Sequence, residues 1–210
     1  MTTLIYATGN PAKLDWMKRE LSPLDIRLLG LKDISFTPPE VDESGNDPLE
    51  NAKIKALAYY KAIHTQTELK FPVFSCDSGL YIKGAPDYMQ PGVHVRNVNG
   101  KRLDDGEMIE YYANIARQMG GKVFAGYRNG ICLVVSEGEV YEYMGGDIAS
   151  REFILTDRPH QKRVEGFPLD SLSVETASGK YYFDLDDDRI KDDYAEGGFA
   201  EFFRRSLGKR

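Results

Sequence analysis

One short stretch near the start of the chain constrains the fold more than any other. The apolar run Leu4-Ile5-Tyr6 leads directly into Ala7-Thr8-Gly9-Asn10-Pro11-Ala12-Lys13. This order predicts a buried strand, a tight turn at Gly9 and then a helix, because asparagine is a good N-cap and proline suits the first helical position. Apolar residues recur at helical spacing and would pack this helix on a sheet, namely Leu14, Met17 and Leu21.

The start of the predicted helix suits an anion, and phosphate above all. The first turn of a helix has backbone N–H groups without partners and carries positive partial charge. Thr8 adds a hydroxyl group, and Lys13 adds a positive charge one turn into the helix. An ordinary strand-to-helix turn with a solvated lysine would read the same way, and this stretch alone leaves both interpretations open.

The composition indicates a folded protein with one domain or two closely joined lobes. The chain has 210 residues, of which 41% are hydrophobic and 29% charged. Its net charge of −6 argues against a broad surface for nucleic acid or anionic membranes, so any anion site must be local. No apolar run approaches the roughly 18 residues of a membrane-spanning helix, and no secretion signal is evident.

The cysteines and histidines give no sign of a disulfide framework or a zinc site. The only cysteines are Cys76 and Cys132, which lie far apart without metal-ligand spacing. No two histidines stand four residues apart, as a helical zinc site often requires. Reduced thiols are the simplest interpretation, and we therefore expect a cytoplasmic protein.

The first helix is followed by a second predicted strand and an acidic loop. Ile26–Leu31 completes a β-α-β start, and Thr37–Gly45 reads as a loop because its paired prolines and Ser-Gly step prevent regular structure. The loop contains three carboxylates, Glu40, Asp42 and Glu43. They could bind a cation, or they could serve only solubility.

A second helix has a clear start. Asp47 is expected to cap it, Pro48 to occupy its first position, and Glu50 to complete a capping box. The capping role accounts for Glu50 without a metal. Lys55, one turn later, would point either toward a phosphate or toward water.

Asp77 is the acid that the sequence places best for chemistry. Pro72–Cys76 reads as a buried strand that ends at Asp77-Ser78-Gly79, before Leu80-Tyr81-Ile82. Open α/β sheets present functional groups where internal strands end. The alternative is an aspartate that only forms the turn with Gly79. We favour function, because a buried carboxylate without a partner is costly.

The second half of the chain alternates between loops and short regular segments. Val93–Arg96 is strand-like and delivers an arginine, and Leu103–Met119 reads as a surface helix. An antiparallel meander is expected next, with turns at Asn129-Gly130 and Gly138. Its strands, the later loop, the later strand and the closing helix are predicted at Val123–Tyr127, Ile131–Val135, Val140–Tyr143, Arg163–Asp170, Lys180–Leu185 and Phe199–Leu207. The acidic cluster Asp186–Asp193 reads as a solvated face.

These elements predict an α/β fold: a two-lobed mixed β-sheet flanked by helices. One lobe would comprise about residues 1–100 with the C-terminal segment, and the other residues 101–185. A substrate would bind in a cleft between the lobes, a usual place for small-ligand sites.

Taken together and in order, the motifs resemble those of the inosine/xanthosine triphosphate pyrophosphatase family, which removes non-standard purine nucleoside triphosphates. The matches span residues 3 to about 170. They are Thr8-Gly9-Asn10-Pro11-Ala12-Lys13, Pro39-Glu40, Glu43-Ser44-Gly45, Glu50-Asn51-Ala52 with Lys55-Ala56, Asp77-Ser78-Gly79-Leu80, Pro91-Gly92 with Arg96, and Gly166-Phe167 with Asp170.

The chain departs from the family pattern at three places. The family has a second acid just before its D-S-G-L motif, where this chain has Cys76. Its base-binding loop has a glycine and a second aromatic residue where this chain has Pro168-Leu169. A late S-H-R motif that reads the purine edge is absent, and alignment at Lys191 puts Ala195-Glu196-Gly197 in its place. Base choice could therefore have changed while the triphosphate chemistry survived.

The resemblance implies an enzyme that hydrolyses nucleoside triphosphates to monophosphates and pyrophosphate with Mg²⁺, for which Mn²⁺ could substitute. Glu40 and Asp77 would be the metal ligands, and Asp77 would orient or deprotonate the attacking water. Phe167 would stack on the base, and Asp170 would accept a hydrogen bond from its edge. The triphosphate would be held by Thr8, Gly9, Asn10, Lys13, Lys55, Ser78 and Arg96.

Several alternatives stay open on the sequence. The substrate could be a pyrimidine or modified triphosphate, because S-H-R is missing. Cys76 could mark a nucleotide-binding protein that has lost catalysis, and an α/β domain without any nucleotide would be the simplest case. The resemblance also implies a homodimer, whereas the net charge is the reason to expect no nucleic-acid or membrane partner.

Overall fold

The computed structural model describes residues 1–186 and 197–208. The chain forms two compact units, each assembled from segments that lie far apart in the sequence. The first contains Met1–Ser78, Asn129–Ile148 and Gly197–Arg210, and the second contains Gly79–Arg128 and Ala149–Glu196. The strands connect in the order β2-β1-β3-β6-β8-β9, with β7 paired to β6. Among the described residues, no helix combines the length and apolarity needed to cross a membrane.

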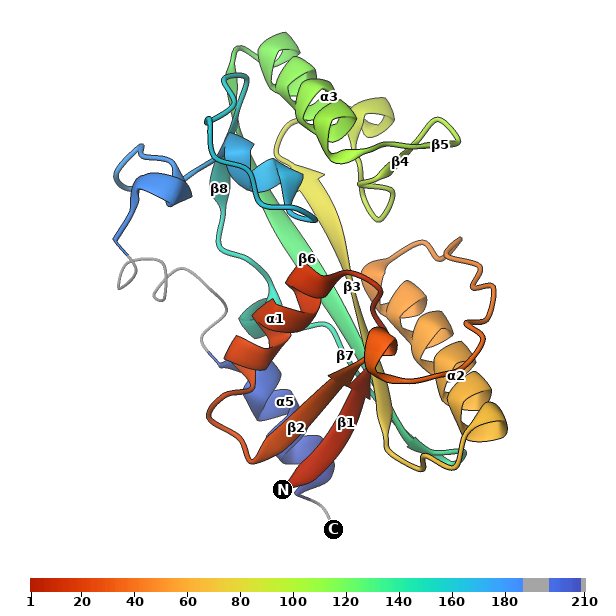
Figure 1. The fold of residues 1–210 in the computed structure, drawn as a ribbon. Coiled ribbons are helices and arrows are strands. Elements are labelled where there is room, and N and C mark those ends of the chain that lie inside the picture. Colours follow the sequence, from red (N-terminus) through yellow and green to blue (C-terminus); the bar gives the residue numbers. More distant parts are fainter. Residues whose placement is uncertain (187–196, 209–210) are drawn as a thin grey trace. The chain divides into compact units, whose positions relative to one another are not determined.

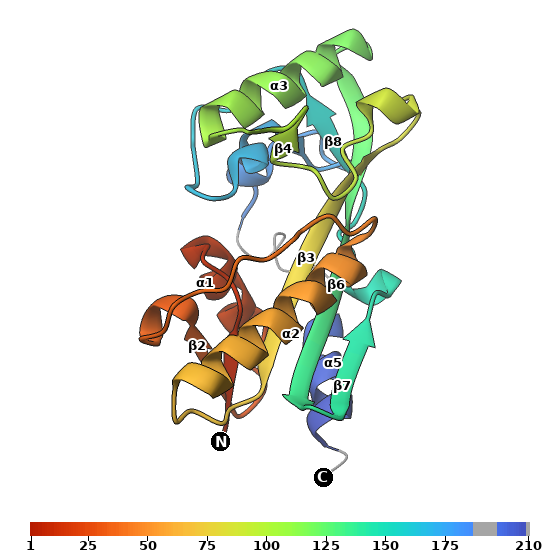
Figure 2. The same cartoon turned by 90° about the vertical axis from the view of Figure 1, so that its right-hand side faces the viewer.

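The first unit is built on a parallel core of three strands. β1 (Thr2–Tyr6) pairs in parallel with β2 (Ile26–Gly30) on one side and with β3 (Val73–Ile82) on the other. The end of β6 (Lys122–Ser136) forms a hairpin with β7 (Glu139–Tyr143). Helices α1 (Pro11–Glu20) and α5 (Gly198–Leu207) lie on one side of β3, and α2 (Pro48–Gln66) lies on the other (Figures 1 and 2).

Large aromatic side chains fill the core under α1 and α5. The rings of Tyr6 and Phe74 stack with centroids 4.6 Å apart, and Phe203 of α5 meets Phe74 edge-on at 4.8 Å. Small residues allow α2 to approach the opposite face, where Ala52 and Ala56 pack on Cys132 and Val134 of β6. Their neighbours Ile131 and Leu133 belong to the aromatic core, so alternate residues of β6 serve different layers, as the pleat of a strand requires.

The second unit is a helix packed on short strands. α3 (Asp105–Gln118) lies over β8 (Phe153–Thr156), which pairs with the start of β6 and with β9 (Ser173–Val174). Met108, Ile109 and Tyr112 of α3 are buried against Leu169 and Leu172 of a 3-10 turn over Pro168–Leu172. A two-stranded hairpin, β4 (Asn97–Val98) and β5 (Lys101–Arg102), precedes α3.

Helix boundaries set by local sequence are confirmed. Asn10 caps α1 and Pro11 begins it, while Asp47 caps α2 and Pro48 begins it. The capping box at α2 is only half formed. Asp47 accepts from the Glu50 N–H at 2.9 Å, but the Glu50 carboxylate accepts from the Asn46 N–H at 2.8 Å instead of from the cap residue.

Two predicted turns at glycines are wrong. β3 continues through Asp77-Ser78-Gly79, so Asp77 lies within a strand and not at its end. A side chain at Gly79 would place a Cβ 3.0 Å from the Gly92 carbonyl oxygen, which shows that this glycine permits a close approach. β6 likewise continues through Gly130, where a Cβ would lie 2.3 Å from the Leu49 nitrogen.

Other predictions also changed with the structure. The strand expected at Lys180–Leu185 is a single bridge residue, Tyr181, followed by a 3-10 turn. Val93–Arg96 is not a strand. The first unit gives way to the second after Ser78, because Leu80 and Ile82 enter the core beneath α3. The acidic cluster and the S-H-R position lie largely outside the described residues, and the cleft between lobes stays a prediction.

Candidate active site

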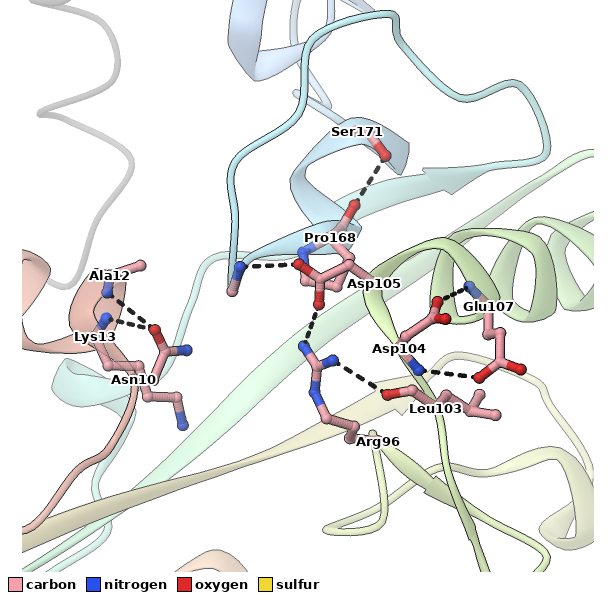
Figure 3. A network of polar contacts seen from close by, with 11 residues as sticks. Asn10, Ala12, Lys13, Arg96, Leu103, Asp104, Asp105, Glu107, Pro168 and Ser171 are labelled. Carbon is pink, nitrogen blue, oxygen red and sulfur yellow. Dashed lines mark hydrogen bonds and ion pairs between the residues drawn. The ribbon is translucent and has the colours of Figure 1, made fainter.

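The turn before α1 is organised by its own side chains. The Asn10 carboxamide oxygen accepts from the N–H groups of Ala12 at 2.9 Å and Lys13 at 3.4 Å (Figure 3). The Thr8 hydroxyl accepts from the Asn10 N–H at 3.2 Å. A phosphate bound here would therefore meet fewer unpaired N–H groups than a bare helix start offers. The positive end of the helix dipole, the Gly9 backbone and the Lys13 charge are the features that would attract it.

The strand register brings this turn close to the acidic part of β3. Tyr6 pairs with Phe74, and the Ala7 N–H donates to the Phe74 carbonyl oxygen at 2.8 Å. β1 thus ends beside Phe74, whereas β3 continues past this point through Asp77. Burial raises the pKa of the Cys76 thiol to about 12, and the positive charge of Lys13 opposes part of that rise. Lys13 therefore acts electrostatically on the residue beside Asp77.

Asp77 lies at the centre of a buried polar cluster in the first unit. Its Oδ1 atom accepts from the Lys55 ammonium at 3.2 Å, and its Oδ2 atom accepts from the Asn51 carboxamide at 3.2 Å. Asn51 and Lys55 are four residues apart on α2, so both side chains project from one face of the helix. Asp77 is 9% exposed, and this pairing makes its burial tolerable.

Lys55 also joins the cluster to the acidic loop. Its ammonium contacts Glu43 Oε2 at 2.9 Å as well as Asp77. Burial alone would lower the pKa of Lys55, but the Asp77 and Glu43 carboxylates outweigh it and hold this pKa above its ordinary value. Lys55 is therefore a fixed positive charge at neutral pH, placed between an acid of β3 and an acid of the loop.

Two further predicted residues of the first unit, Glu40 and Ser78, are not part of the cluster around Asp77 and Lys55. Glu40 is exposed on the loop, and within the described residues it has no recorded hydrogen bond or ion pair. Ser78 is half-buried in β3. On the Asp77 side of that strand, two residues earlier, the buried Ser75 hydroxyl has no partner among the groups that the structure describes.

The donor set fits magnesium carried by a polyphosphate better than a resident ion. The acids near Lys55 offer only oxygen ligands, which Mg²⁺ prefers, and it commonly takes one or two carboxylates with substrate phosphates. Over residues 1–186 and 197–208, no group of three or more histidines, cysteines or acids is placed to hold an ion. Magnesium binding at these acids therefore stays a prediction.

In the second unit, Arg96 is bound within the protein. Its guanidinium contacts Asp105 Oδ1 at 2.8 Å and donates to the Leu103 carbonyl oxygen at 3.2 Å. The other carboxylate oxygen of Asp105 accepts from the Gly166 N–H at 2.9 Å, which ties the start of α3 to the loop before Phe167 (Figure 3). A phosphate contact by Arg96 stays a prediction, and it would compete with this ion pair.

Part of the loop that the resemblance assigns to base binding, around Phe167 and Asp170, is buried in the core. Phe167 is half-buried, and burial raises the pKa of Asp170 to about 6. Leu169, which replaces the expected second aromatic residue, is only 3% exposed and packs under α3. It is therefore a core residue, and of the two hydrophobic side chains only Phe167 is partly accessible.

The predicted site residues thus divide between the two units. Thr8 to Lys13, Glu40, Lys55, Asp77 and Ser78 belong to the first unit, and Arg96, Phe167 and Asp170 belong to the second. Sequence reasoning missed the polar contacts of Asn51 and Asp105. Asn51 stands one helical turn before Lys55, a spacing that could have indicated a shared target.

Comparisons with known proteins agree with these features. A model of the Ham1 family matches residues 4–166. A dITP/XTP pyrophosphatase of Thermus thermophilus is 28% identical over 182 residues, covering 87% of this chain and 80% of that protein. One from Bacillus subtilis is 36% identical over 110 residues, covering 52% of this chain and 51% of that protein.

Solved structures share the fold. A HAM1 protein from Coxiella burnetii superimposes with a TM-score of 0.71 at 22% identity, over 100% of both chains. The Staphylococcus aureus Ham1 protein superimposes with a TM-score of 0.67 at 20% identity, also over 100% of both chains. The predicted mixed α/β fold is confirmed.

Proposed function

Because the chain belongs to the Ham1 family, we propose that it is a pyrophosphatase of non-standard purine nucleoside triphosphates. It would release a nucleoside monophosphate and pyrophosphate. The observation that carries the proposal is the buried cluster of Asp77, Lys55 and Asn51, which is joined to the acidic loop through Glu43. The names of the relatives, dITP/XTP pyrophosphatases, support this substrate class.

Asp77 is the proposed catalytic residue. Its carboxylate would orient the attacking water and accept its proton, a role that typically contributes about 10²–10⁴-fold in rate. Lys55 stabilises the ionised carboxylate and places a positive charge beside it. The Lys55 charge would also attract the phosphate oxygens. These oxygens carry negative charge, and positive groups must balance this charge during phosphoanhydride cleavage.

The other residues of the first unit would bind the triphosphate. Thr8, Gly9 and Asn10 form the turn at the positive end of α1, and Lys13 adds charge there. Glu40 and Asp77 would hold a magnesium ion that arrives with the substrate. Such an ion neutralises phosphate charge and polarises phosphoryl oxygens. Mn²⁺, which also accepts oxygen ligands, is expected to substitute for it.

The base would be recognised by residues of the second unit. Phe167 would stack on the ring, and Asp170 would interact with its edge. With a pKa of about 6, the Asp170 carboxyl would change charge near neutral pH and with it the hydrogen bonds it can make. We further propose that the enzyme acts in the cytoplasm as a homodimer.

A substrate panel tests the proposal. The purified chain is assayed with Mg²⁺ on inosine, xanthosine, deoxyinosine and deoxyuridine triphosphates and on the standard nucleoside triphosphates, with monophosphate and pyrophosphate both quantified. Preference for the first three and a one-to-one product ratio are expected. Asp77→Asn should abolish turnover, whereas the exposed Asp87→Asn should not. Normal pyrophosphate release by Asp77→Asn would refute the catalytic role.

A second candidate keeps the reaction and changes the base. Leu169 in the core leaves the base loop with fewer exposed ring surfaces than its relatives' motif would offer, which favours a pyrimidine or otherwise modified triphosphate. The same panel distinguishes the two candidates. Binding without hydrolysis over hours, measured by calorimetry with Mg²⁺ or Mn²⁺, would instead indicate a nucleotide-binding protein.

A further inference from the structure

Asn51 is a buried polar residue on α2 to which the proposed mechanism assigns no role. Its side chain is 2% exposed and is held from both ends. The carboxamide oxygen accepts from the Gly45 N–H at 2.9 Å, and the carboxamide nitrogen donates to Asp77 Oδ2 at 3.2 Å. From this geometry we propose that Asn51 is a positioning residue, which fixes the Asp77 carboxylate for catalysis and couples it to the acidic loop. The inference rests on the proposed function.

The orientation of the Asn51 carboxamide follows from its partners. A backbone N–H can only donate, so the atom facing Gly45 must be the oxygen. The nitrogen then faces Asp77, and an ionised carboxylate can only accept. Neither bond survives a flip of the amide, so the two contacts define one arrangement.

Two donors from one helix hold the two oxygens of Asp77 separately. Asn51 donates to Oδ2 and Lys55 donates to Oδ1, each at 3.2 Å. A carboxylate with one donor on each oxygen cannot rotate without breaking a bond, so the direction of its remaining lone pairs is set. Among the residues that the structure describes, removing the Asn51 donor would leave Lys55 to hold the carboxylate, and Lys55 is shared with Glu43. Loss of orientation of this kind lowers catalytic rates steeply.

The contact with the loop is equally specific. A Cβ at Gly45 would lie 2.5 Å from the Asn51 carboxamide oxygen, closer than real Cβ contacts, so only glycine allows the loop to reach Asn51. The same loop contains Glu43, two residues earlier, which contacts Lys55. Asn51 and Lys55 therefore each bridge the loop and Asp77. Movement of the loop on substrate binding would be transmitted to the carboxylate through these two side chains.

The alternative is that Asn51 only fastens the loop to α2. Asn51→Asp keeps an acceptor for the Gly45 N–H and, where both carboxyl groups are ionised, loses the donor to Asp77. Because it also places a second acid beside Asp77, its kcat is compared with that of the neutral Asn51→Ala, which loses the donor without adding charge. A fastening role predicts little change in the rate constant of the folded enzyme. A positioning role predicts that kcat falls about 10- to 100-fold while KM changes by less than about 3-fold. Asn114→Asp, on an exposed face of α3, adds the same charge elsewhere and should keep both constants.

Asn51→Ala removes both contacts and provides a second test should Asn51→Asp fold poorly. Its kcat, measured well below its thermal midpoint, should fall at least as far as that of Asn51→Asp. Wild-type kcat in a folded variant that lacks the donor would overturn the inference. If the unmodified protein hydrolyses no triphosphate, the proposed function fails while the contact itself can still be examined.

A measurement without turnover examines that contact. The side-chain amide protons of Asn51 should exchange slowly in nuclear magnetic resonance spectra, because they are buried and hydrogen-bonded. Their resonances should shift in Asp77→Asn and stay in place in Asp87→Asn. Rapid exchange, or resonances insensitive to Asp77→Asn, would show that the contact is absent and would overturn the inference independently of activity.

Discussion

Replacing Lys55 with methionine removes the charge that compensates the buried Asp77 carboxylate. Methionine keeps most of the apolar stem, so packing changes little. The Lys55 ammonium lies 3.2 Å from Asp77 Oδ1 and 2.9 Å from Glu43 Oε2, and the Lys55 side chain is 15% exposed. At an effective dielectric constant of about 20, unit charges at the first distance attract by about 5 kcal/mol, and desolvation of the lysine offsets part of this.

The net cost of removing one partner from a buried pair is about 3–5 kcal/mol, because the other charge stays buried without compensation. Glu43 is half-exposed and adds about 1 kcal/mol or less. For a chain of this size, about 3 kcal/mol corresponds to a fall in the thermal midpoint of about 6–12 °C. We expect Lys55→Met to show a fall of that size in calorimetry at pH 7.

The double variant Lys55→Met with Asp77→Asn provides the decisive comparison. It has no buried charge at these two positions, so it should regain about 2 kcal/mol or more relative to Lys55→Met alone. The pKa of Lys55 lies above its ordinary value, so its contribution is complete below about pH 10 and is lost only as the pH rises further. The charge of Lys55 in the wild type is therefore the same at pH 6 and pH 8. Additive midpoints in the double variant would refute the reasoning.

Three further predictions follow from the local geometry. Gly9→Ala should fold normally, because a Cβ at this position meets open space and the φ angle of Gly9 is not left-handed. If phosphate approaches the Gly9 backbone closely, the added methyl group should weaken triphosphate binding measured by calorimetry. Unchanged affinity would exclude that approach. Burial alone would raise the pKa of Asp105, but the Gly166 N–H and Arg96 outweigh burial and lower this pKa. The contacts of the ionised Asp105 carboxylate therefore stabilise the fold above about pH 4, and this stabilisation is lost as the pH falls through the pKa of Asp105 in the folded protein. Asp105→Asn should therefore cost about 0.5–1 kcal/mol at pH 7 and almost nothing at pH 3, measured by thermal unfolding, and an equal cost at both pH values would contradict the assignment. Burial raises the pKa of Asp170 to about 6, so ionisation of this carboxyl destabilises the fold as the pH rises from about 4 to above 6. Asp170→Asn should therefore be more stable than wild type by about 2 kcal/mol at pH 8 and equal to it at pH 4. A difference in stability that does not vary with pH would refute this.

Helix starts could be predicted from the sequence because they depend on residues a few positions apart. Asn10 with Pro11 and Asp47 with Pro48 cap helices through contacts within three residues, and both helices begin where expected. The closing helix was predicted at Phe199–Leu207 and is found at Gly198–Leu207. The order of the motifs, from the turn at Thr8 to the loop at Phe167, was sufficient to identify the family.

Glycines show where local reasoning fails. Gly79 and Gly130 looked like turn residues, but both lie within long strands and are needed because Gly92 and Leu49 approach them closely. Those partners lie 13 and 81 residues away in the sequence. No local pattern distinguishes a glycine that permits a turn from one that permits a contact of this kind.

The site divides in the same way. The sequence identified Asp77 as a chemical group, because a carboxylate after an apolar run suggests function, and it identified Lys55 through the family resemblance. It did not show that Lys55 pairs with both Asp77 and Glu43, that Asn51 holds Asp77, or that Arg96 is bound by Asp105. Those partners come from separate helices, strands and loops. Local sequence sets which groups a segment carries, whereas packing between segments sets which of them meet and which charge each group can hold once it is removed from water.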